Sequence, residues 1–415
     1  LGFHVALVGS ALLLGSKGLM LVSVAFAPVW VGYALEEEGS LERRFGLAWT
    51  RYRTRVGLLP KPSLYLLARV ATHLGLFPVT VEGSLPPGPA VLVANHACYV
   101  DFLFVAATTW RRVSFTTTAE VWCTPAMRRV LYFRANIPLR RYRSDPAACR
   151  EVLRLLGEGE LVGIFPEGER SPLGDYQGSL PDVASILSRL GVPVIPVGLS
   201  GTYDVGPRWS DVLRRRPVRV RIGAPIVWTA DPKADVDRAL RALIDVDPQR
   251  VELVGLPLSK LGRVLWRCPR CAAAWSPPTC AGCGATLRAG PAGNLEFAGQ
   301  TQTLAELAAP LWAAPEPLPL RVPAIAFRER SIFGPPEALE PMGEGTLELN
   351  GAGVTFEGPR GRFELLEVRS ASTERADTLQ VATRSAMWQF VVAEGSAFRL
   401  QRAVRVVPAT VRRPR

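Results

Sequence analysis

The first part of the chain is apolar almost throughout. Residues 1–35 carry Lys17 as their only fixed charge, and glycine and lysine interrupt the run at residues 15–18. An apolar stretch of this length with a central break fits two short membrane helices better than one span. The charged stretch that follows has aromatic residues at helical spacing, as an interfacial helix would. The pattern predicts a membrane hairpin and an amphipathic segment over residues 1–60.

The hydrophobic pattern changes over residues 61–258. Short apolar runs at 90–94, 161–165 and 193–199 are separated by stretches with helical periodicity, such as 148–159. Apolar runs of four to eight residues that alternate with helices are typical of strands in an α/β domain. We therefore predict a mixed sheet flanked by helices.

The remainder of the chain divides by composition. Residues 259–288 contain four cysteines, and residues 289–343 are proline-rich with little periodicity, which predicts a linker. Residues 344–406 show short alternating strands, glycine-rich turns and a final helical pattern. This pattern predicts a small β domain, followed by a basic tail at 407–415.

Composition supports a protein at a membrane surface. A chain of 415 residues exceeds one ordinary domain, and its 48% hydrophobic content and positive mean hydropathy are high for a soluble protein. The formal net charge of +12 lies beside a hydrophobic segment, where anionic lipid headgroups attract cations. Nucleic acid is not expected as a partner because no reader fold is recognisable. A general arginine bias is the alternative explanation of the charge.

The seven cysteines separate into two kinds. Three are scattered through apparent core and do not resemble a disulfide framework, which indicates a reducing compartment and places the site on the cytoplasmic side of the cell membrane. The other four form two close pairs, Cys268, Cys271, Cys280 and Cys283. Two such pairs predict a ribbon that holds a structural zinc ion through four thiolates. Four ordinary reduced thiols are the alternative.

A histidine and an aspartate follow the apolar run at 90–94. His96 and Asp101 could supply a general base and the carboxylate that orients it. Positions five apart on a helix lie roughly 140° from each other. The pair can therefore meet only if His96 lies in a turn and Asp101 in the first turns of a helix, and otherwise the spacing is a surface coincidence.

Three further motifs accompany this pair. The four segments are Asn-His-Ala-Cys-Tyr-Val-Asp at 95–101, Ile-Pro-Leu-Arg-Arg at 137–141, Phe-Pro-Glu-Gly-Glu-Arg-Ser at 165–171 and Val-Pro-Val-Ile-Pro-Val-Gly at 192–198. In order and spacing they resemble the four blocks of the glycerolipid acyltransferase family, typified by 1-acylglycerol-3-phosphate acyltransferases. The resemblance covers about residues 62–230. It implies a membrane enzyme that transfers a fatty acyl group from acyl coenzyme A or acyl carrier protein to the hydroxyl of a lysophospholipid.

The resemblance also implies roles for individual residues. His96 would be the general base, and Asp101 would orient it and stabilise the imidazolium. Substrate-binding roles fall on Glu167 and Gly168 for the acceptor's glycerol, Arg141 and Arg170 for its phosphate, and Pro196 for the acyl donor. Each arginine has a structural salt bridge as its alternative.

Two positions depart from the family pattern. Glu169 stands where a small hydroxylated residue is usual, and it adds a negative charge beside the expected phosphate site. Cys98 stands where serine is common, and a buried thiol near a strand end is more often inert packing than a nucleophile. The acceptor class is therefore less defined than the chemistry.

A second resemblance concerns residues 1–60. Glu37, Glu38, Leu41, Phe45, Gly46, Tyr52 and Val56 are similar to the C-terminal pattern of isoprenylcysteine carboxyl methyltransferases and related phospholipid methyltransferases. Trp49 replaces the first tyrosine of that pattern, and the upstream cofactor motif is absent from this sequence. The chain could thus be the C-terminal part of a methyltransferase–acyltransferase fusion.

The C-terminal β domain resembles the pleckstrin-homology and GRAM type of barrel. This combination of modules leaves a non-catalytic lipid-binding adaptor as a rival to the enzyme. The presence of His96, Asp101 and Glu167 argues against the adaptor.

Overall fold

A computed structural model describes most of the chain after residue 77. The described residues are 78–118, 136–139, 145–244, 256–290, 294–329, 339–351, 353–392 and 395–406. All belong to one compact unit, formed by residues 68–128 and 136–415. The predicted membrane hairpin and Arg141 lie outside the described residues. Within the described ranges, no helix is both long and apolar enough to cross a bilayer.

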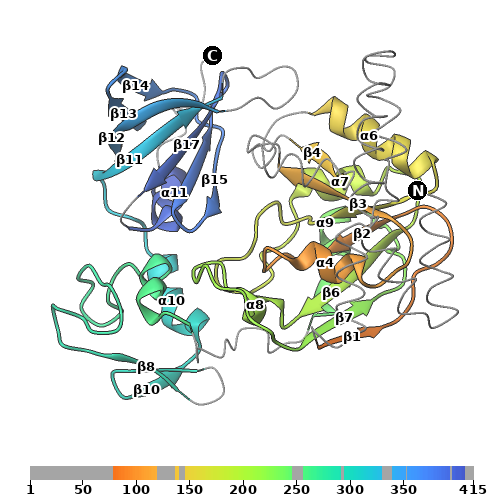
Figure 1. Cartoon of the computed structure of the whole chain (residues 1–415), viewed down its shortest axis with the longest axis horizontal. Helices are drawn as coiled ribbons and strands as arrows, with labels where there is room; N and C mark the ends of the chain where they lie inside the picture. The colour runs from red at the N-terminus through yellow and green to blue at the C-terminus, as the bar shows by residue number, and fades with distance from the viewer. Residues whose placement is uncertain are drawn as a thin grey trace, which may run out of the picture. The chain divides into compact units, whose positions relative to one another are not determined.

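The described residues between 78 and 244 contain a seven-stranded sheet (Figure 1). We call this part the acyltransferase-like region, after its sequence resemblance. Its strands are β1 (Val79–Glu82), β2 (Ala90–Ala94), β3 (Val113–Thr118), β4 (Ile137–Leu139), β5 (Leu161–Ile164), β6 (Val194–Ser200) and β7 (Val218–Ile222). They lie in the order β1-β7-β6-β2-β5-β3-β4. Neighbouring strands are parallel except for the β6–β7 pair, which is antiparallel. The prediction of a mixed sheet is confirmed.

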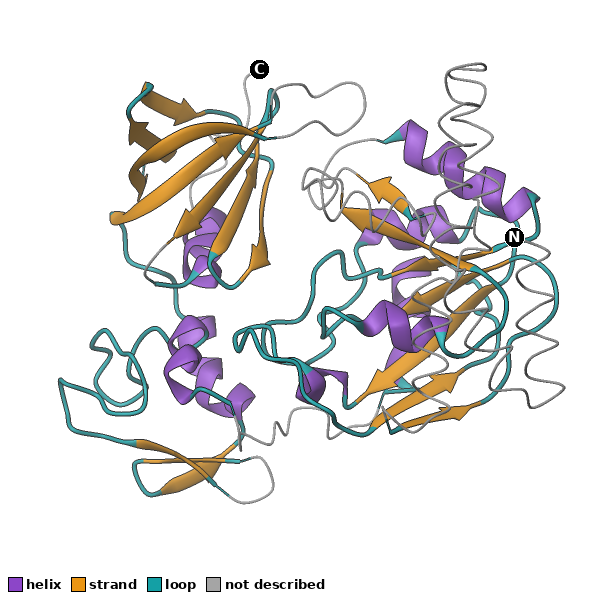
Figure 2. Cartoon of the chain, viewed as in Figure 1, coloured by secondary structure: helices purple, strands orange, loops and turns teal. Residues whose placement is uncertain are grey.

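Helices cover this sheet (Figure 2). They are α4 (Asp101–Ala106), α6 (Pro146–Gly157), α7 (Pro181–Leu187), α8 (Thr202–Val205) and α9 (Pro232–Arg241). Helices α6, α7 and α9 share one hydrophobic cluster with Val91 and Val93 of β2. Helices α6 and α9 each begin with an aspartate that accepts a backbone N–H, followed by a proline in the first turn.

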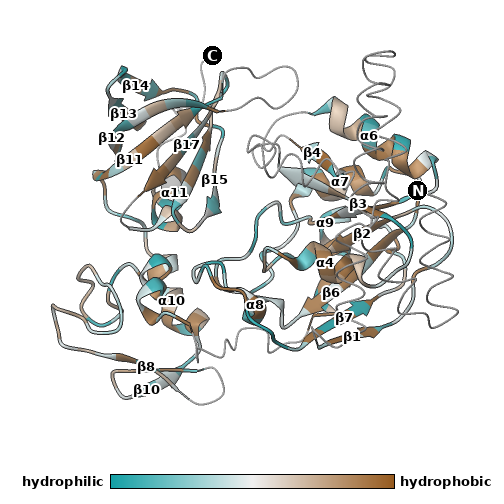
Figure 3. Cartoon of the chain, viewed as in Figure 1, coloured by the Kyte–Doolittle hydropathy of each residue, from teal (hydrophilic) through white to brown (hydrophobic). Residues whose placement is uncertain are grey.

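Burial explains the sequence pattern of the strands. All five residues of β2 are buried, because its neighbours β5 and β6 flank it in the sheet centre. Strand β7 instead alternates buried Val218 and Val220 with more accessible arginines. Figure 3 shows the contrast between hydrophobic β6 and β7, in which hydrophilic arginines alternate with apolar residues.

The cysteine module continues into residues that were predicted to be a linker. It comprises the 3-10 helix η2 (Leu258–Arg263), a sheet of β8 (Leu287–Ala289), β9 (Leu295–Phe297) and β10 (Gln300–Gln302), and helix α10 (Leu304–Ala313). The prediction of a linker over 289–343 is wrong, because the described part of that range contains strands and a helix. Two features hid these elements from the sequence pattern. Strands of three residues are too short to show periodicity, and α10 is apolar because it packs into a hydrophobic core. A capping box formed by Thr303 and Glu306 was the available signal.

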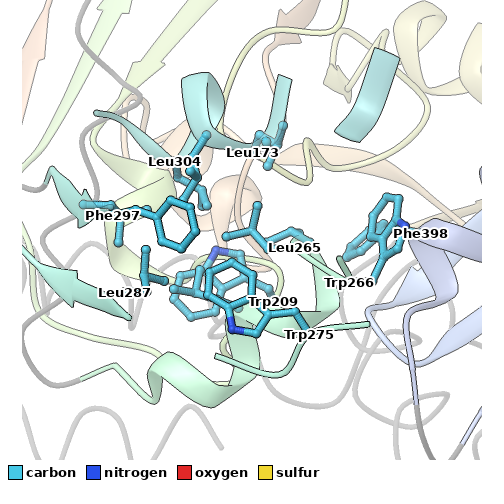
Figure 4. Close-up of a cluster of buried hydrophobic side chains, with 14 of the residues drawn as sticks. Leu173, Trp209, Leu265, Trp266, Trp275, Leu287, Phe297, Leu304 and Phe398 are labelled. Carbon is cyan, nitrogen blue, oxygen red and sulfur yellow. The ribbon is translucent and has the colours of Figure 1, made fainter. Parts of the chain in front are cut away.

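One hydrophobic cluster joins this module to its surroundings. Figure 4 shows it, and its members include Trp209, Trp266, Trp275 and Phe398. The cluster draws on the acyltransferase-like region, the cysteine module and the last helix of the chain. The module is therefore packed against its neighbours rather than tethered to them.

The C-terminal β domain is longer than predicted. It contains β11 (Leu320–Arg328), β12 (Glu340–Asn350), β13 (Gly353–Gly358), β14 (Gly361–Leu365), β15 (Ser370–Arg375), β16 (Thr378–Ala382), β17 (Met387–Val392) and α11 (Ala397–Val406). The antiparallel sheet has the order β14-β13-β12-β11-β17-β16-β15. The domain starts at Leu320 rather than at residue 344, because β11 is the central strand of this sheet and pairs with both β12 and β17.

Candidate active site

Two of the sequence motifs, which follow two different strands, meet at one edge of the sheet. His96 lies two residues after β2, and Glu167 lies three residues after β5. Strands β2 and β5 are parallel neighbours, so their carboxyl ends lie side by side. Ligand sites in open α/β sheets form at this edge.

His96 and Asp101 form the expected dyad. His96 Nδ1 lies 2.8 Å from Asp101 Oδ2. His96 is in the turn after β2 and Asp101 is the first residue of α4, so the turn brings the two side chains together. The same Oδ2 accepts the backbone N–H groups of Ala97 at 2.7 Å and Cys98 at 2.8 Å. A carboxylate only accepts hydrogen bonds, so it selects the tautomer with the proton on Nδ1. Nε2 then keeps the lone pair that a general base needs.

The surroundings of His96 favour its neutral form. Its ring stacks on Phe165 at 4.1 Å between centroids, and 20% of its side chain is exposed. Burial is the largest influence and lowers the pKa of His96, and the cations Arg170 and Arg208 lower that pKa further. The hydrogen bond and charge of Asp101 raise the pKa but do not reverse the direction. The lowered pKa thus favours the unprotonated form of His96 at neutral pH.

With His96 as the general base that the family resemblance implies, this direction predicts the pH dependence of acyl transfer. We expect kcat/KM for acyl transfer to fall on the acid side with an apparent pKa below 6.5, because protonation of His96 removes the base. Above that pKa the rate should stay level through neutral pH. The measurement is kcat/KM at saturating acyl donor from pH 4.5 to 8.5. An acid limb centred above 6.5 would contradict the prediction, since Asp101 would then outweigh burial.

Glu167 connects the loops after β2 and β5. Its Oε1 accepts the backbone N–H of His96 at 2.7 Å, and its Oε2 accepts that of Gln177 at 2.8 Å. Burial raises the pKa of Glu167 to about 8, against the lowering effect of these two hydrogen bonds. Gly168 follows with φ +73°, and a Cβ there would meet Leu180 Cδ1 at 2.7 Å. Glu167 therefore holds the backbone of His96, and the turn at Gly168 leaves no room for a side chain.

The remaining predicted residues lie in different surroundings. Arg170 is buried, and its guanidinium carbon lies 3.3 Å from the ring centroid of Tyr99. Pro196 is buried in β6, where it pairs with Val93 of β2. Cys98 is also buried, and burial followed by the charge of Asp101 raises the pKa of its thiol to about 12. The Cys98 thiol therefore stays protonated at neutral pH, which argues against a nucleophilic role.

The structure adds residues that the sequence patterns did not single out. Asn95 donates from Nδ2 to the Leu199 carbonyl at 2.9 Å and accepts the Leu199 N–H at 2.7 Å, which ties the end of β2 to β6. Arg208 is buried and donates to the Arg170 carbonyl and to Thr373. Its segment, between α8 and β7, has no periodic pattern that would have indicated this position.

The four predicted metal ligands come together. All four sulfur atoms of Cys268, Cys271, Cys280 and Cys283 lie within 4.8 Å of one another. The Cys268–Cys283 and Cys271–Cys280 sulfur distances are 3.7 and 3.6 Å. Sulfurs bound tetrahedrally at about 2.3 Å from zinc would be roughly 3.8 Å apart. The donor set and its spacing fit a zinc ion.

Comparisons with known proteins show that this part of the chain is similar to acyltransferases. Residues 78–200 match a family model described as Acyltransferase. A chloroplastic 1-acyl-sn-glycerol-3-phosphate acyltransferase of Arabidopsis thaliana is 28% identical over 182 residues, which cover 41% of this chain and 50% of that protein. A lyso-ornithine lipid O-acyltransferase of Pseudomonas aeruginosa is 30% identical over 170 residues, covering 39% and 64% respectively.

A solved structure also matches this chain. It is the crystal structure of the 1-acyl-sn-glycerophosphate acyltransferase of Thermotoga maritima, with 20% identity and a TM-score of 0.37, covering 54% of this chain and 91% of the other. The chain spans about half the length of the first curated relatives it matches. The matched residues contain the dyad and Glu167. The dyad and Glu167 thus lie in the part of the chain that is similar to acyltransferases.

Proposed function

We propose that this chain transfers a fatty acyl group from acyl coenzyme A or acyl carrier protein to the free hydroxyl of a lysophospholipid similar to 1-acylglycerol-3-phosphate. The observation that carries the proposal is the His96–Asp101 pair, held at the edge of β2 and β5 inside the matched domain. The names of the relatives, which act on 1-acylglycerol 3-phosphate and on a lyso-lipid, support the acceptor class.

The chemistry follows from the orientation of His96. Nε2 takes the proton of the acceptor hydroxyl as its oxygen forms a bond to the thioester carbonyl carbon. Asp101, held by two backbone N–H groups, stabilises the imidazolium. The tetrahedral intermediate then breaks its carbon–sulfur bond, and the thiolate leaves with the proton returned by His96. No acyl-enzyme is required.

Substrate contacts are assigned from the family resemblance. Glu167 and Gly168 line the acceptor's glycerol, Arg141 and Arg170 face its phosphate, and Pro196 lines the acyl-donor side. The position of Glu167 beside the His96 backbone supports the first assignment.

A structural zinc ion completes the cysteine module in this proposal. Four thiolates leave no open coordination position for substrate, so the ion stabilises the fold and takes no part in acyl transfer. The resemblance of the C-terminal domain to pleckstrin-homology and GRAM barrels remains a prediction, supported by seven antiparallel strands followed by a helix.

The reaction takes place at the cell membrane, on its cytoplasmic side. The apolar run at residues 1–35 and the net charge of +12 support this location. Residues 1–60 act in this scheme as the membrane anchor, whether or not they derive from a methyltransferase-like segment.

An acceptor panel tests the function. Membrane and soluble fractions from cells that produce the full chain are assayed with radiolabelled acyl coenzyme A, or acyl carrier protein, and lysophospholipids that differ in headgroup. We expect headgroup-dependent diacyl product in the membrane fraction above the level of cells without the protein. If the protein binds lyso-lipids but forms no product with either donor, the proposed enzyme function is wrong and the lipid-binding adaptor is favoured.

A further inference from the structure

The C-terminal β domain contacts the motif that contains Glu167. Glu169 and Arg170 lie two and three residues after Glu167, and both interact with residues more than 200 positions later in the chain. Strand β15 contributes Thr373 and Glu374, and helix α11 contributes Gln401. Arg170, which is expected to face the acceptor's phosphate, and Glu169 beside it are thus held by a domain outside the matched residues 78–200.

Arg170 is held from two sides. Its Nη2 donates to the Glu374 carbonyl and lies 3.7 Å from the Glu374 carboxylate. Tyr99 stacks beneath the guanidinium and donates from its hydroxyl to the same Glu374 carbonyl at 3.3 Å. The side chain is 6% exposed, and its buried Nη1 has no hydrogen-bond acceptor among the described residues. One headgroup oxygen would satisfy that nitrogen, whereas Nη2 already has an acceptor.

Glu169 is held in a similar way. Gln401 Nε2 lies 3.2 Å from each Glu169 carboxylate oxygen and also donates to the Ala371 carbonyl at 3.0 Å. Arg208 Nη1 lies 3.8 Å from Glu169 Oε2, and Arg208 reaches Thr373 of β15. The carboxylate that departs from the family pattern therefore forms part of a contact between two domains.

Each of two arginines in this contact lies near a carboxylate. Arg170 faces the carboxylate of Glu374, and Arg208 faces that of Glu169. A phosphomonoester brings close to two negative charges at neutral pH, while a phosphodiester brings one. Neighbouring carboxylates disfavour the second charge at a buried site, where screening is weak.

We propose that β15 and α11 make the C-terminal β domain the acceptor-selecting element of the acyltransferase domain. By holding Glu169 and Arg170, they direct the site to lyso-lipids whose phosphate is a diester with one negative charge, in preference to the phosphomonoester lysophosphatidic acid. This inference rests on the proposed function and names the substrate class of the same site.

The test compares two acceptors in the full chain. We measure kcat and KM for lysophosphatidic acid and lysophosphatidylglycerol in wild type, Glu169→Gln and Glu374→Gln. Wild type should prefer lysophosphatidylglycerol. Each substitution removes one negative charge and should shift the ratio of the two kcat/KM values about three- to tenfold toward lysophosphatidic acid, mainly through KM.

A matched control separates charge at the site from charge in general. Glu348 pairs with Arg321 at 3.1 Å within the β domain, away from Glu169 and Arg170 in the strand order. Glu348→Gln should leave the acceptor ratio unchanged. The melting temperature of each variant shows whether it is folded.

The outcomes distinguish the inference from the proposed function. A wild-type preference for lysophosphatidic acid, or an unchanged ratio in both folded site variants, overturns the inference while acyl transfer stands. Product from no acceptor overturns the proposed function itself. If a site variant does not fold, the wild-type preference still decides.

Discussion

Replacement of His96 by alanine should lower kcat for acyl transfer by about 10² to 10⁴, the usual contribution of general-base catalysis. His96 is the residue whose Nε2 is left unprotonated by the contact with Asp101, and a lipid hydroxyl attacks a thioester poorly without a base. The fold should persist, because the backbone of His96 makes the bonds to Glu167 and Ser171. The measurement is the initial rate with saturating donor and acceptor at equal amounts of folded protein.

Cys98→Ala is the matched control for this variant. Cys98 lies in the same turn, is buried and also donates its backbone N–H to Asp101. Its thiol has no part in the proposed reaction, so this variant should keep most of the wild-type turnover. Near wild-type turnover by His96→Ala would refute the mechanism, and an equal loss in both variants would attribute the effect to packing of the turn.

Replacement of both Cys268 and Cys271 by serine should remove the zinc, from about one ion per chain to none, and unfold the cysteine module. Structural zinc sites in isolated zinc-finger peptides bind with apparent free energies on the order of 10 kcal/mol or more, which is folding free energy for such modules. The cluster around Trp209 and Trp275 should loosen as a result. Metal analysis of the purified protein, together with tryptophan fluorescence during thermal unfolding, gives the measurement.

Cys149→Ser controls for loss of a thiol as such. Cys149 is exposed on α6 and lies outside the four-cysteine group. The zinc content and the unfolding transition of the Cys149→Ser variant should match those of the wild-type protein. Unchanged zinc content in the Cys268→Ser, Cys271→Ser double variant would show that the ribbon has been misinterpreted.

Local patterns were sufficient for part of the site. The dyad depends on one turn, in which a buried strand ends at Ala94 and a helix begins at Asp101. The four cysteines also come from two short turns, and the structure places their sulfurs together. Interactions between residues close in the chain leave few alternative geometries. The spacing of the cysteines therefore indicated their cluster, whereas the His96–Asp101 pair was predicted from its spacing together with the family resemblance.

Patterns failed where packing rather than periodicity decides structure. Residues 289–343 were predicted to be a linker, yet α10 and β11 form there because their apolar residues complete cores supplied by other segments. Very short strands carry no period that a sequence window can detect. The β domain accordingly begins at Leu320, earlier than its alternating pattern indicated.

The sequence by itself determined the α/β class, the order of the motifs, the pairing of His96 with Asp101, and the identity of the clustered cysteines. The tertiary structure alone decided that Glu167 accepts the His96 backbone N–H, and that Tyr99, Arg208, Glu374 and Gln401 surround the segment Glu169–Arg170. The physical reason is distance along the chain. Contacts within a turn follow from backbone geometry, whereas contacts across 70 to more than 200 residues exist only after separate cores have packed together.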